Sequence, residues 1–282
     1  MKSWRLGLLM GALLALSACS PLSLLNAVIG DDDLVVRSGI PYGPNARQAM
    51  DIYGPKLRKE PLSVVVFFYG GSWRRGDRAD YLFVAEALAS RGYMTVVPDY
   101  RTYPEVRFPA FVEDGAKAVR WVLDNIASFG GDPERLYLMG HSAGGHIASM
   151  LTLDERYLAA EGVDARRLRG TIALAGPHAF YPSRTTNVAP IFAHLANENE
   201  ARPIMYVDGD EAPLLLLHGG DDDIVLPFNA LDLSRAVSDA GGAVRHIIYP
   251  DVGHFKILFA LAGPLRGLAP VLDDIAAFID GQ

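Results

Sequence analysis

Short apolar segments alternate with longer amphipathic segments along most of this chain. Residues 63–68 form a continuous apolar run, which is typical of a strand buried on both faces of a parallel sheet. Seven further segments have the length and composition of strands: 34–40, 47–53, 93–97, 135–139, 171–175, 214–217 and 244–249. Helical spacing is found at 79–90, 108–128, 143–153, 229–239 and 269–280. The alternation predicts an α/β protein with a mostly parallel central sheet flanked by helices on both faces.

One stretch departs from the alternation. Residues 177–212 are rich in proline and polar residues and carry no strong period. We therefore expect a short insertion over one end of the sheet. The elements on both sides of it continue the same pattern, so residues 34–282 are predicted to form one domain.

The amino-acid composition excludes several classes of protein and of functional site. Half of the 282 residues are hydrophobic, which excludes intrinsic disorder. The net charge of −7 makes nucleic acid an unsuitable partner, because a duplex-binding surface needs excess Lys and Arg. A single cysteine excludes an internal disulfide and a cysteine-based metal cluster. No pair of histidines has the His-Glu-x-x-His spacing, so we expect neither metal nor cofactor.

The first residues have the pattern of an export signal. Lys2 and Arg5 precede an apolar run over residues 6–16, which is too short to span a bilayer and suits a signal peptide. Residues 16–19 (Leu-Ser-Ala-Cys) resemble a bacterial lipobox, in which the cysteine becomes the lipidated first residue. We expect a signal peptide over 1–18, lipidation of Cys19 and a tether over 19–33. The alternatives are a soluble signal peptide that is cut after Ala18 and an ordinary core cysteine.

The predicted location follows from the lipobox resemblance. A lipidated chain would be anchored in the cell envelope. Ser20 follows the cysteine, and lipoprotein sorting rules then favour the outer membrane facing the periplasm if the host is Gram-negative.

The first candidate catalytic motif lies at residues 140–144, which have the sequence Gly-His-Ser-Ala-Gly. This Gly-x-Ser-x-Gly pattern follows an apolar strand and precedes a helix, the context of a nucleophile elbow. The tight turn exposes Ser142 at the helix N-terminus, where backbone N–H groups can stabilise an oxyanion. We therefore predict Ser142 as a nucleophile.

A serine hydroxyl needs a base, and the base needs an acid that orients it. His254 lies in a loop after the last predicted strand, where the elbow topology places the base. The acid is expected between Ser142 and His254 in the chain, and the segment after the strand at 214–217 offers three aspartates. We choose Asp222, with Asp223 and Asp221 as the alternatives.

The oxyanion would need a second backbone donor besides the N–H of Ala143. Residues 69–73 (Tyr-Gly-Gly-Ser-Trp) follow the buried strand at 63–68, and their glycines allow close approach of backbone to a ligand. The backbone N–H groups of this turn are the candidates. An ordinary turn at a strand end is the alternative.

Together these motifs resemble an α/β-hydrolase of the esterase/lipase group, which includes hormone-sensitive-lipase-like carboxylesterases and kynurenine-formamidase-like enzymes. The resemblance covers about residues 34–280. Its further markers are Asp99-Tyr100-Arg101, Pro104-Glu105, Phe108-Pro109-Ala110, Asp114, Gly131-Asp132-Pro133 and the His-Gly-x-x-Asp pattern at 218–222. It implies a Ser142–His254–Asp222 triad and an oxyanion hole made by the N–H groups of Gly71, Ser72 and Ala143.

Two residues depart from the family pattern. Tyr69 stands where the family usually has His, and Ser72 stands where many members have a third Gly. The insertion is short for a lipase cap, so small or medium acyl groups are expected. Three functions compete: a carboxylesterase for small-molecule esters, an amidase or formamidase, and a non-catalytic envelope lipoprotein on a hydrolase fold.

Overall fold

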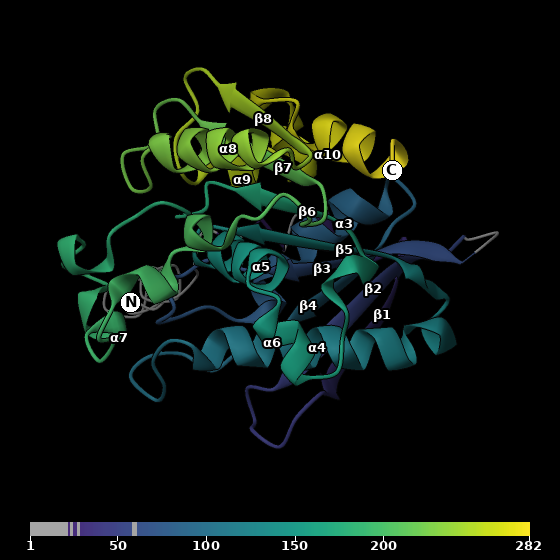
Figure 1. The fold of residues 1–282 in the computed structure, drawn as a ribbon. Coiled ribbons are helices and arrows are strands. Elements are labelled where there is room, and N and C mark those ends of the chain that lie inside the picture. The colour runs from purple at the N-terminus through teal and green to yellow at the C-terminus, as the bar shows by residue number, and fades with distance from the viewer. Residues whose placement is uncertain (1–21, 23–24, 27–28, 58–60) are drawn as a thin grey trace, which may run out of the picture.

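The structure is a computed structural model that describes residues 22, 25–26, 29–57 and 61–282. Its centre is an eight-stranded sheet of order β1-β2-β4-β3-β5-β6-β7-β8 (Figure 1). The strands are β1 Leu34–Pro41, β2 Ala49–Pro55, β3 Leu62–Phe68, β4 Met94–Pro98, β5 Gly131–His141, β6 Leu168–Leu174, β7 Leu214–Gly219 and β8 Val244–Tyr249. Each corresponds to one predicted strand.

The register of the sheet explains its hydrophobic sequence. β1 and β2 pair antiparallel, as do β2 and β4. The other neighbouring pairs, from β4–β3 through to β7–β8, are parallel. Val64 of β3 pairs with Met94 on one side and Leu136 on the other. Because β3 has a strand on both sides and helices on both faces, its side chains from Ser63 to Phe68 are all buried.

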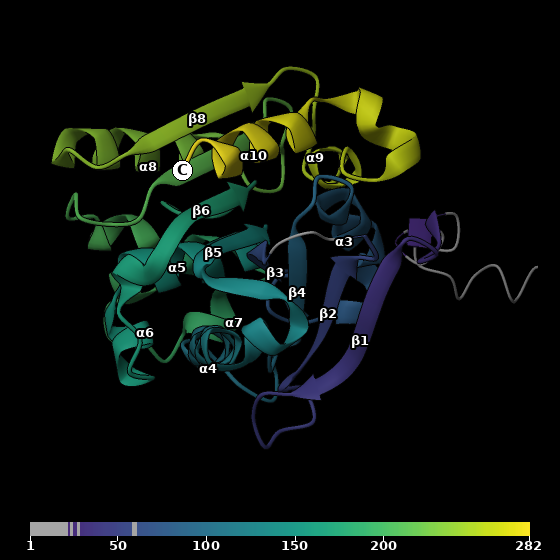
Figure 2. The ribbon, with the colours of Figure 1, turned by 90° about the vertical axis from the view of Figure 1, so that its right-hand side faces the viewer.

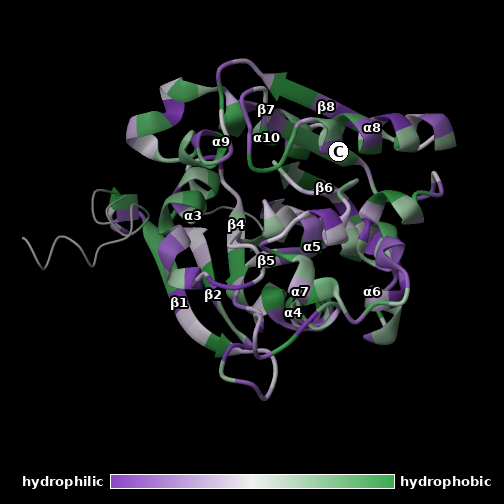
Figure 3. Cartoon of the chain, turned by 90° about the vertical axis from the view of Figure 1, so that its left-hand side faces the viewer, coloured by the Kyte–Doolittle hydropathy of each residue, from purple (hydrophilic) through white to green (hydrophobic). Residues whose placement is uncertain are grey.

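Helices cover both faces of the sheet (Figure 2). α3 Leu82–Ala89 and α10 Val271–Asp280 lie on one face, and α4 Ala110–Asn125, α5 Ala143–Leu153 and α8 Phe228–Ala240 lie on the other. In β7, Leu214 and Leu216 pack with Leu233 of α8. Leu215 and Leu217 belong to the main core instead. The period of two in a strand thus supplies both faces with leucine. α8 in turn carries both hydrophobic and hydrophilic residues around its axis (Figure 3).

Several elements are too short to show a period in the sequence. These are the helices α6 Arg156–Ala160, α7 Ala189–Phe192 and α9 Lys256–Phe259, and the 3₁₀ turns η1 Arg78–Tyr81, η2 Ile126–Phe129, η3 Ala165–Arg167, η4 Pro182–Arg184, η5 Glu198–Ala201, η6 Pro203–Tyr206 and η7 Gly263–Leu268. Three of the turns, η4, η5 and η6, and the helix α7 lie within the predicted insertion. The predicted helix at 79–90 begins as η1, where the Asp77 carboxylate accepts a hydrogen bond from the N–H of Ala79.

Four of the described residues before β1 contact the rest of the domain. The partly buried side chains of Leu22, Leu25 and Ile29 pack on the core. The Asn26 amide donates to the carbonyl of Ala79, and its oxygen accepts from the N–H of Phe83. The predicted signal peptide and Cys19 lie outside the described residues. Within the part of the chain that the structure describes, no helix is long and apolar enough to cross a bilayer.

Candidate active site

Ser142 occupies a strained turn between β5 and α5. Its backbone has φ +55° and ψ −120°, a conformation that is costly for a residue with a side chain. The turn is possible because of two glycines. A Cβ at Gly140 would lie 2.2 Å from the carbonyl oxygen of Gly144, and one at Gly144 would lie 1.9 Å from that of Phe68. The Gly-x-Ser-x-Gly pattern is therefore a packing requirement of this elbow.

The three predicted polar residues meet at the carboxyl ends of β5, β7 and β8. The Ser142 hydroxyl lies 2.9 Å from Nε2 of His254. Nδ1 of His254 lies 2.8 Å from Oδ2 of Asp222, close enough to donate to that carboxylate. Neighbouring parallel strands end at the same edge of the sheet, which is why residues 112 positions apart in the chain come into contact.

Asp222 is held as a carboxylate by its loop. Oδ1 accepts hydrogen bonds from the N–H groups of Ile224 and Val225, at 3.0 and 2.9 Å. Oδ2 faces Nε2 of His218 at 3.3 Å, as well as His254. Burial acts to raise the pKa of Asp222, but the hydrogen bonds from His218 and His254 hold that pKa well below its usual range. Asp221 and Asp223, the two alternatives, are exposed.

His141, the variable residue of the elbow, has a role that the sequence did not indicate. Its Nε2–H donates to the backbone carbonyl of His254 at 2.9 Å, and the two rings lie 4.8 Å apart. Burial, with the neighbouring His254, lowers the pKa of His141 to about 3, so the ring is neutral near pH 7. The position of His141, directly before the nucleophile, was the available signal.

The expected donors for an oxyanion lie beside Ser142. Ala143 is the first residue of α5, so its N–H is one of the helix's unpaired terminal donors. Gly71 has φ +132° and Ser72 has φ +55°. A Cβ at Gly71 would lie 2.0 Å from the carbonyl oxygen of Arg75, so the loop closes only with glycine there. Ser72, Ser142 and Ala143 line one cavity of about 560 Å³.

Comparison with models of known protein families assigns this chain to a family. The model of the BD-FAE family matches residues 50–237, about two thirds of the sequence. The chain belongs to the BD-FAE family. The matched region includes Ser142 and Asp222 and ends before His254.

Curated relatives of this BD-FAE family member carry esterase names. The chain is 28% identical over 253 residues to a probable isoprenylcysteine alpha-carbonyl methylesterase, ICME, of Oryza sativa, with 83% of this chain and 60% of the relative covered. It is also 28% identical over 268 residues to esterase LipQ of Mycobacterium tuberculosis, with 87% and 63% covered. The chain therefore spans about 60% of the length of these relatives.

Solved structures confirm the fold that the resemblance implied. A truncated carbohydrate esterase from gut microbiota matches with a TM-score of 0.75 at 20% identity, covering 89% of this chain and 98% of that one. Thermogutta terrifontis esterase 2 matches with a TM-score of 0.73 at 21% identity, covering 91% and 97%. The mostly parallel sheet with helices on both faces is thus the α/β-hydrolase fold.

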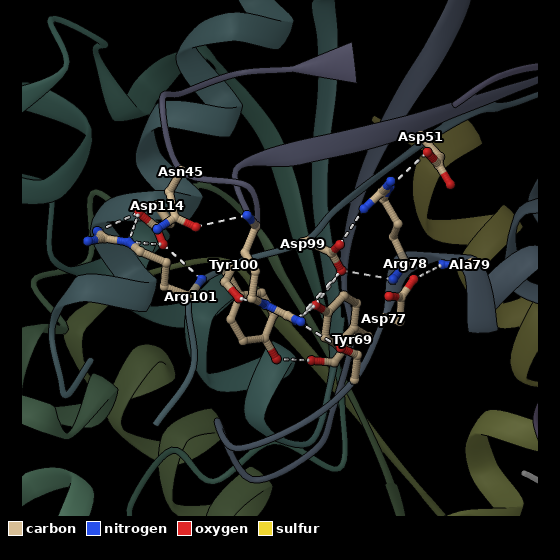
Figure 4. Close-up of polar contacts among 12 residues, drawn as sticks. Asn45, Asp51, Tyr69, Asp77, Arg78, Ala79, Asp99, Tyr100, Arg101 and Asp114 are labelled. Atoms are coloured by element: carbon tan, nitrogen blue, oxygen red, sulfur yellow. Dashed lines mark hydrogen bonds and ion pairs between the residues drawn. The ribbon is translucent and has the colours of Figure 1, made fainter. Parts of the chain in front are cut away.

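Tyr69 anchors the loop that carries Gly71 and Ser72 in this BD-FAE family member (Figure 4). Its hydroxyl donates to Oδ1 of Asp99 at 2.6 Å and accepts from Nη2 of Arg47 at 2.8 Å. Asp99 also pairs with Arg78. Burial raises the pKa of Tyr69, so the hydroxyl stays protonated and remains a donor. The tyrosine that departs from the family pattern is therefore integrated into a buried polar network.

Replacing this hydroxyl is expected to loosen the loop. In Tyr69→Phe, Asp99 and Arg47 each lose a hydrogen bond, and we expect the free energy of unfolding to fall by about 1–3 kcal/mol. Tyr81→Phe is the matched control. The Tyr81 ring stacks on Tyr69 at 5.2 Å, and its hydroxyl has no hydrogen-bond partner among the described residues. Urea unfolding measures both, and equal losses in the two variants would contradict the role assigned to the Tyr69 hydroxyl.

Buried histidines make the stability depend on pH. Burial lowers the pKa of His141 and His178 to about 3 and that of His146 to about 4, against about 6.5 in an unfolded chain. Below pH 6.5 the unfolded state therefore binds more protons than the folded state, so stability falls as the pH falls towards 4. At pH 5 each histidine is expected to contribute a loss of about 2 kcal/mol relative to pH 7.

The slope of unfolding free energy against pH tests this expectation. Between pH 6 and pH 4.5, His146→Gln is expected to reduce the slope by up to about 1.4 kcal/mol per pH unit, because one proton fewer is taken up. His194→Gln, at an exposed position, serves as the control. An unchanged slope in His146→Gln would show that His146 is not a buried neutral group.

Proposed function

We propose that this protein hydrolyses carboxylic esters through an acyl-enzyme formed on Ser142. The observation that carries the proposal is the unbroken series of contacts from the Ser142 hydroxyl through the His254 ring to Asp222, at 2.9 and 2.8 Å. The geometry matches what nucleophilic catalysis by serine requires: a nucleophile within reach of a base, and a base oriented by a third group. The esterase names of the relatives support the same reaction class.

In the proposed first step, Oγ of Ser142 attacks the ester carbonyl carbon while Nε2 of His254 takes the hydroxyl proton. Asp222 holds the imidazole in the tautomer whose Nε2 is free, and then stabilises the imidazolium. Negative charge develops on the former carbonyl oxygen. The N–H groups of Gly71, Ser72 and Ala143 are the proposed donors to it, and one such donor is worth a factor of about 100 to 1,000 in rate.

In the proposed second half, the imidazolium of His254 gives its proton to the leaving alkoxide, and the C–O bond to the alcohol breaks. Water enters, His254 takes one of its protons, and the hydroxide equivalent attacks the acyl-enzyme. Collapse of the second tetrahedral intermediate releases the carboxylic acid and returns the proton to Ser142. His141 is proposed to hold the backbone of His254 through both steps, because its ring donates to the His254 carbonyl.

The experiment that tests the proposal compares ester and amide substrates. A soluble chain that starts after Cys19 is assayed on p-nitrophenyl acetate and on an N-formyl anilide. We expect ester hydrolysis with a much larger kcat/KM than formamide hydrolysis. The opposite order would assign the site to a formamidase, and no turnover of either by the folded protein would refute the proposal.

We also propose that the mature protein is anchored in the cell envelope by lipid on Cys19. The support is the Leu-Ser-Ala-Cys sequence after an apolar run. We expect an alkyne-labelled fatty acid, fed to expressing bacteria, to label the wild-type protein and to leave Cys19→Ser unlabelled. Equal labelling of both forms, or labelling of neither when a known lipoprotein in the same cells is labelled, would contradict the anchor.

A further inference from the structure

Ser142 opens into a cavity of about 560 Å³, which is larger than an acetyl group needs. Pockets of about 300–1,000 Å³ normally bury ligands of drug size. One part of the wall comes from the insertion and includes Phe180, Tyr181 and Val188. Another part of the wall comes from the segment between β7 and α8, with Ile224, Val225 and Leu226, and from Phe228, the first residue of α8. Both parts are therefore mainly apolar.

The outer part of this cavity exposes large hydrophobic side chains. Ile224 is 58% exposed, Leu226 51%, Phe228 41% and Tyr181 39%. They are four of the nine large hydrophobic side chains that are exposed in the described part of the chain. All four line the same cavity, and exposed apolar side chains that gather in one place mark binding sites. Scattered surface hydrophobics would need no such explanation.

The position of the four side chains identifies their occupant. They continue the wall of the same cavity that Ser142, Ala143 and Ser72 line, so a group attached to the reacting carbonyl or to the leaving oxygen would pass over them. Among the described residues that line the cavity, the only charged side chains are Arg184 and Asp223. The Arg184 guanidinium lies over the Tyr181 ring at 4.6 Å, and that of Arg202 lies over the same ring at 3.9 Å.

We propose that Tyr181, Ile224, Leu226 and Phe228 form a subsite for an apolar chain of the substrate, so that the preferred ester carries an aliphatic group of medium length. This inference rests on the proposed ester hydrolysis at Ser142. It adds a substrate class, an amphiphilic ester, and it assigns the specificity to two residues of a loop, Ile224 and Leu226. Their side chains point away from the core, so they can be replaced without opening a cavity in it.

The test uses two series of soluble esters. One series lengthens the acyl chain from p-nitrophenyl acetate to octanoate, and the other lengthens the alcohol from methyl to octyl acetate. Full burial of a methylene is worth about a fourfold change, which corresponds to ~0.8 kcal/mol. We expect kcat/KM of the wild type to rise by about threefold per methylene in at least one series. The series that responds tells on which side of the ester the chain lies.

Substitutions then assign the effect to the loop. Within the series that responds, we compare kcat/KM on the substrate with the eight-carbon chain with kcat/KM on the shortest substrate. In the double variant Ile224→Ser/Leu226→Ser, this ratio is expected to fall at least tenfold. Leu268→Ser is the matched control, because Leu268 is 39% exposed and lies outside this cavity. Unfolding curves of all variants show that the fold is retained.

The possible results separate the inference from the proposed function. Ester hydrolysis that depends on Ser142 but shows no rise with chain length overturns the apolar subsite and leaves the proposed function standing. The same conclusion follows if kcat/KM of the double variant depends on chain length as it does in the wild type. The four exposed side chains would then serve to bind a membrane surface or another protein. Absence of any ester hydrolysis would overturn both.

Discussion

Replacing Ser142 by alanine is expected to lower kcat on p-nitrophenyl esters by about 10⁵- to 10⁶-fold. The substitution removes the only atom that can form the acyl-enzyme, and nucleophile deletions in serine hydrolases have effects of this size. The fold is expected to stay intact, because Ser142→Ala removes one hydroxyl whose hydrogen bond is to His254. Stopped assays at high protein concentration measure the remaining rate.

Ser149→Ala is the matched control for this loss. Ser149 lies on the same helix, α5, is fully buried, and its hydroxyl has no hydrogen-bond partner among the described residues. We expect it to keep wild-type activity within about twofold, since no polar contact is broken. If Ser142→Ala retained more than a few per cent of wild-type kcat, a different nucleophile would have to be sought.

The second large effect is expected at Asp222. In Asp222→Asn the shape of the side chain is kept, but the amide cannot hold His254 in the tautomer whose Nε2 accepts a proton. It also cannot stabilise the imidazolium. We expect kcat to fall by about 10³- to 10⁴-fold, as the loss of a triad carboxylate does elsewhere. The steady-state rates should show most of this loss in kcat and little in KM.

The neighbouring aspartates provide the control for Asp222. Asp221 is exposed, so Asp221→Asn is expected to retain wild-type kcat within about threefold. Asp223→Asn is the second comparison, because Asp223 lines the cavity and could alter KM without changing the triad. A collapse of kcat in either neighbour, with Asp222→Asn active, would reassign the acid.

The centre of the sheet could be predicted because its strands, such as β3 and β7, are buried on both faces. Continuous apolar runs such as 63–68 and 214–217 are typical of strands in the middle of a parallel sheet, and each predicted strand is present. The short helices α6, α7 and α9 could not be predicted. Elements of four or five residues contain barely one turn, so no hydrophobic period can form.

The elbow was predictable for a different reason, since its residues are contiguous in the chain. Gly140 is required by the nearby backbone of Gly144, and Gly144 by the carbonyl of Phe68 in the neighbouring strand. The choice among three aspartates needed the loop itself. In the structure only Asp222 of these three contacts His254, and its other oxygen accepts two backbone N–H groups. Those contacts depend on the path of the loop, which the sequence leaves open.

Hydrogen bonds between residues that are far apart in the chain could not be predicted from the sequence. His141 contacts the carbonyl of His254, 113 residues away, and Tyr69 contacts Asp99, 30 residues away. Composition and motif spacing do not indicate such pairs, because these non-local contacts form only when the strands and loops are assembled in the fold. The apolar wall at 224–228 was missed because a short hydrophobic run in a loop does not show in the sequence whether its side chains are exposed or buried.

Covalent labelling by a fluorophosphonate tests the central claim most directly, because the reagent reacts with a serine only when a base and an oxyanion hole activate it. We predict that the wild-type protein gains the mass of one phosphonyl group and that peptide analysis places it on Ser142. Ser149→Ala should label like the wild type, and Ser142→Ala should remain unlabelled. A folded wild-type protein that stays unlabelled, or an adduct that persists in Ser142→Ala, would contradict the account of Ser142 as an activated nucleophile.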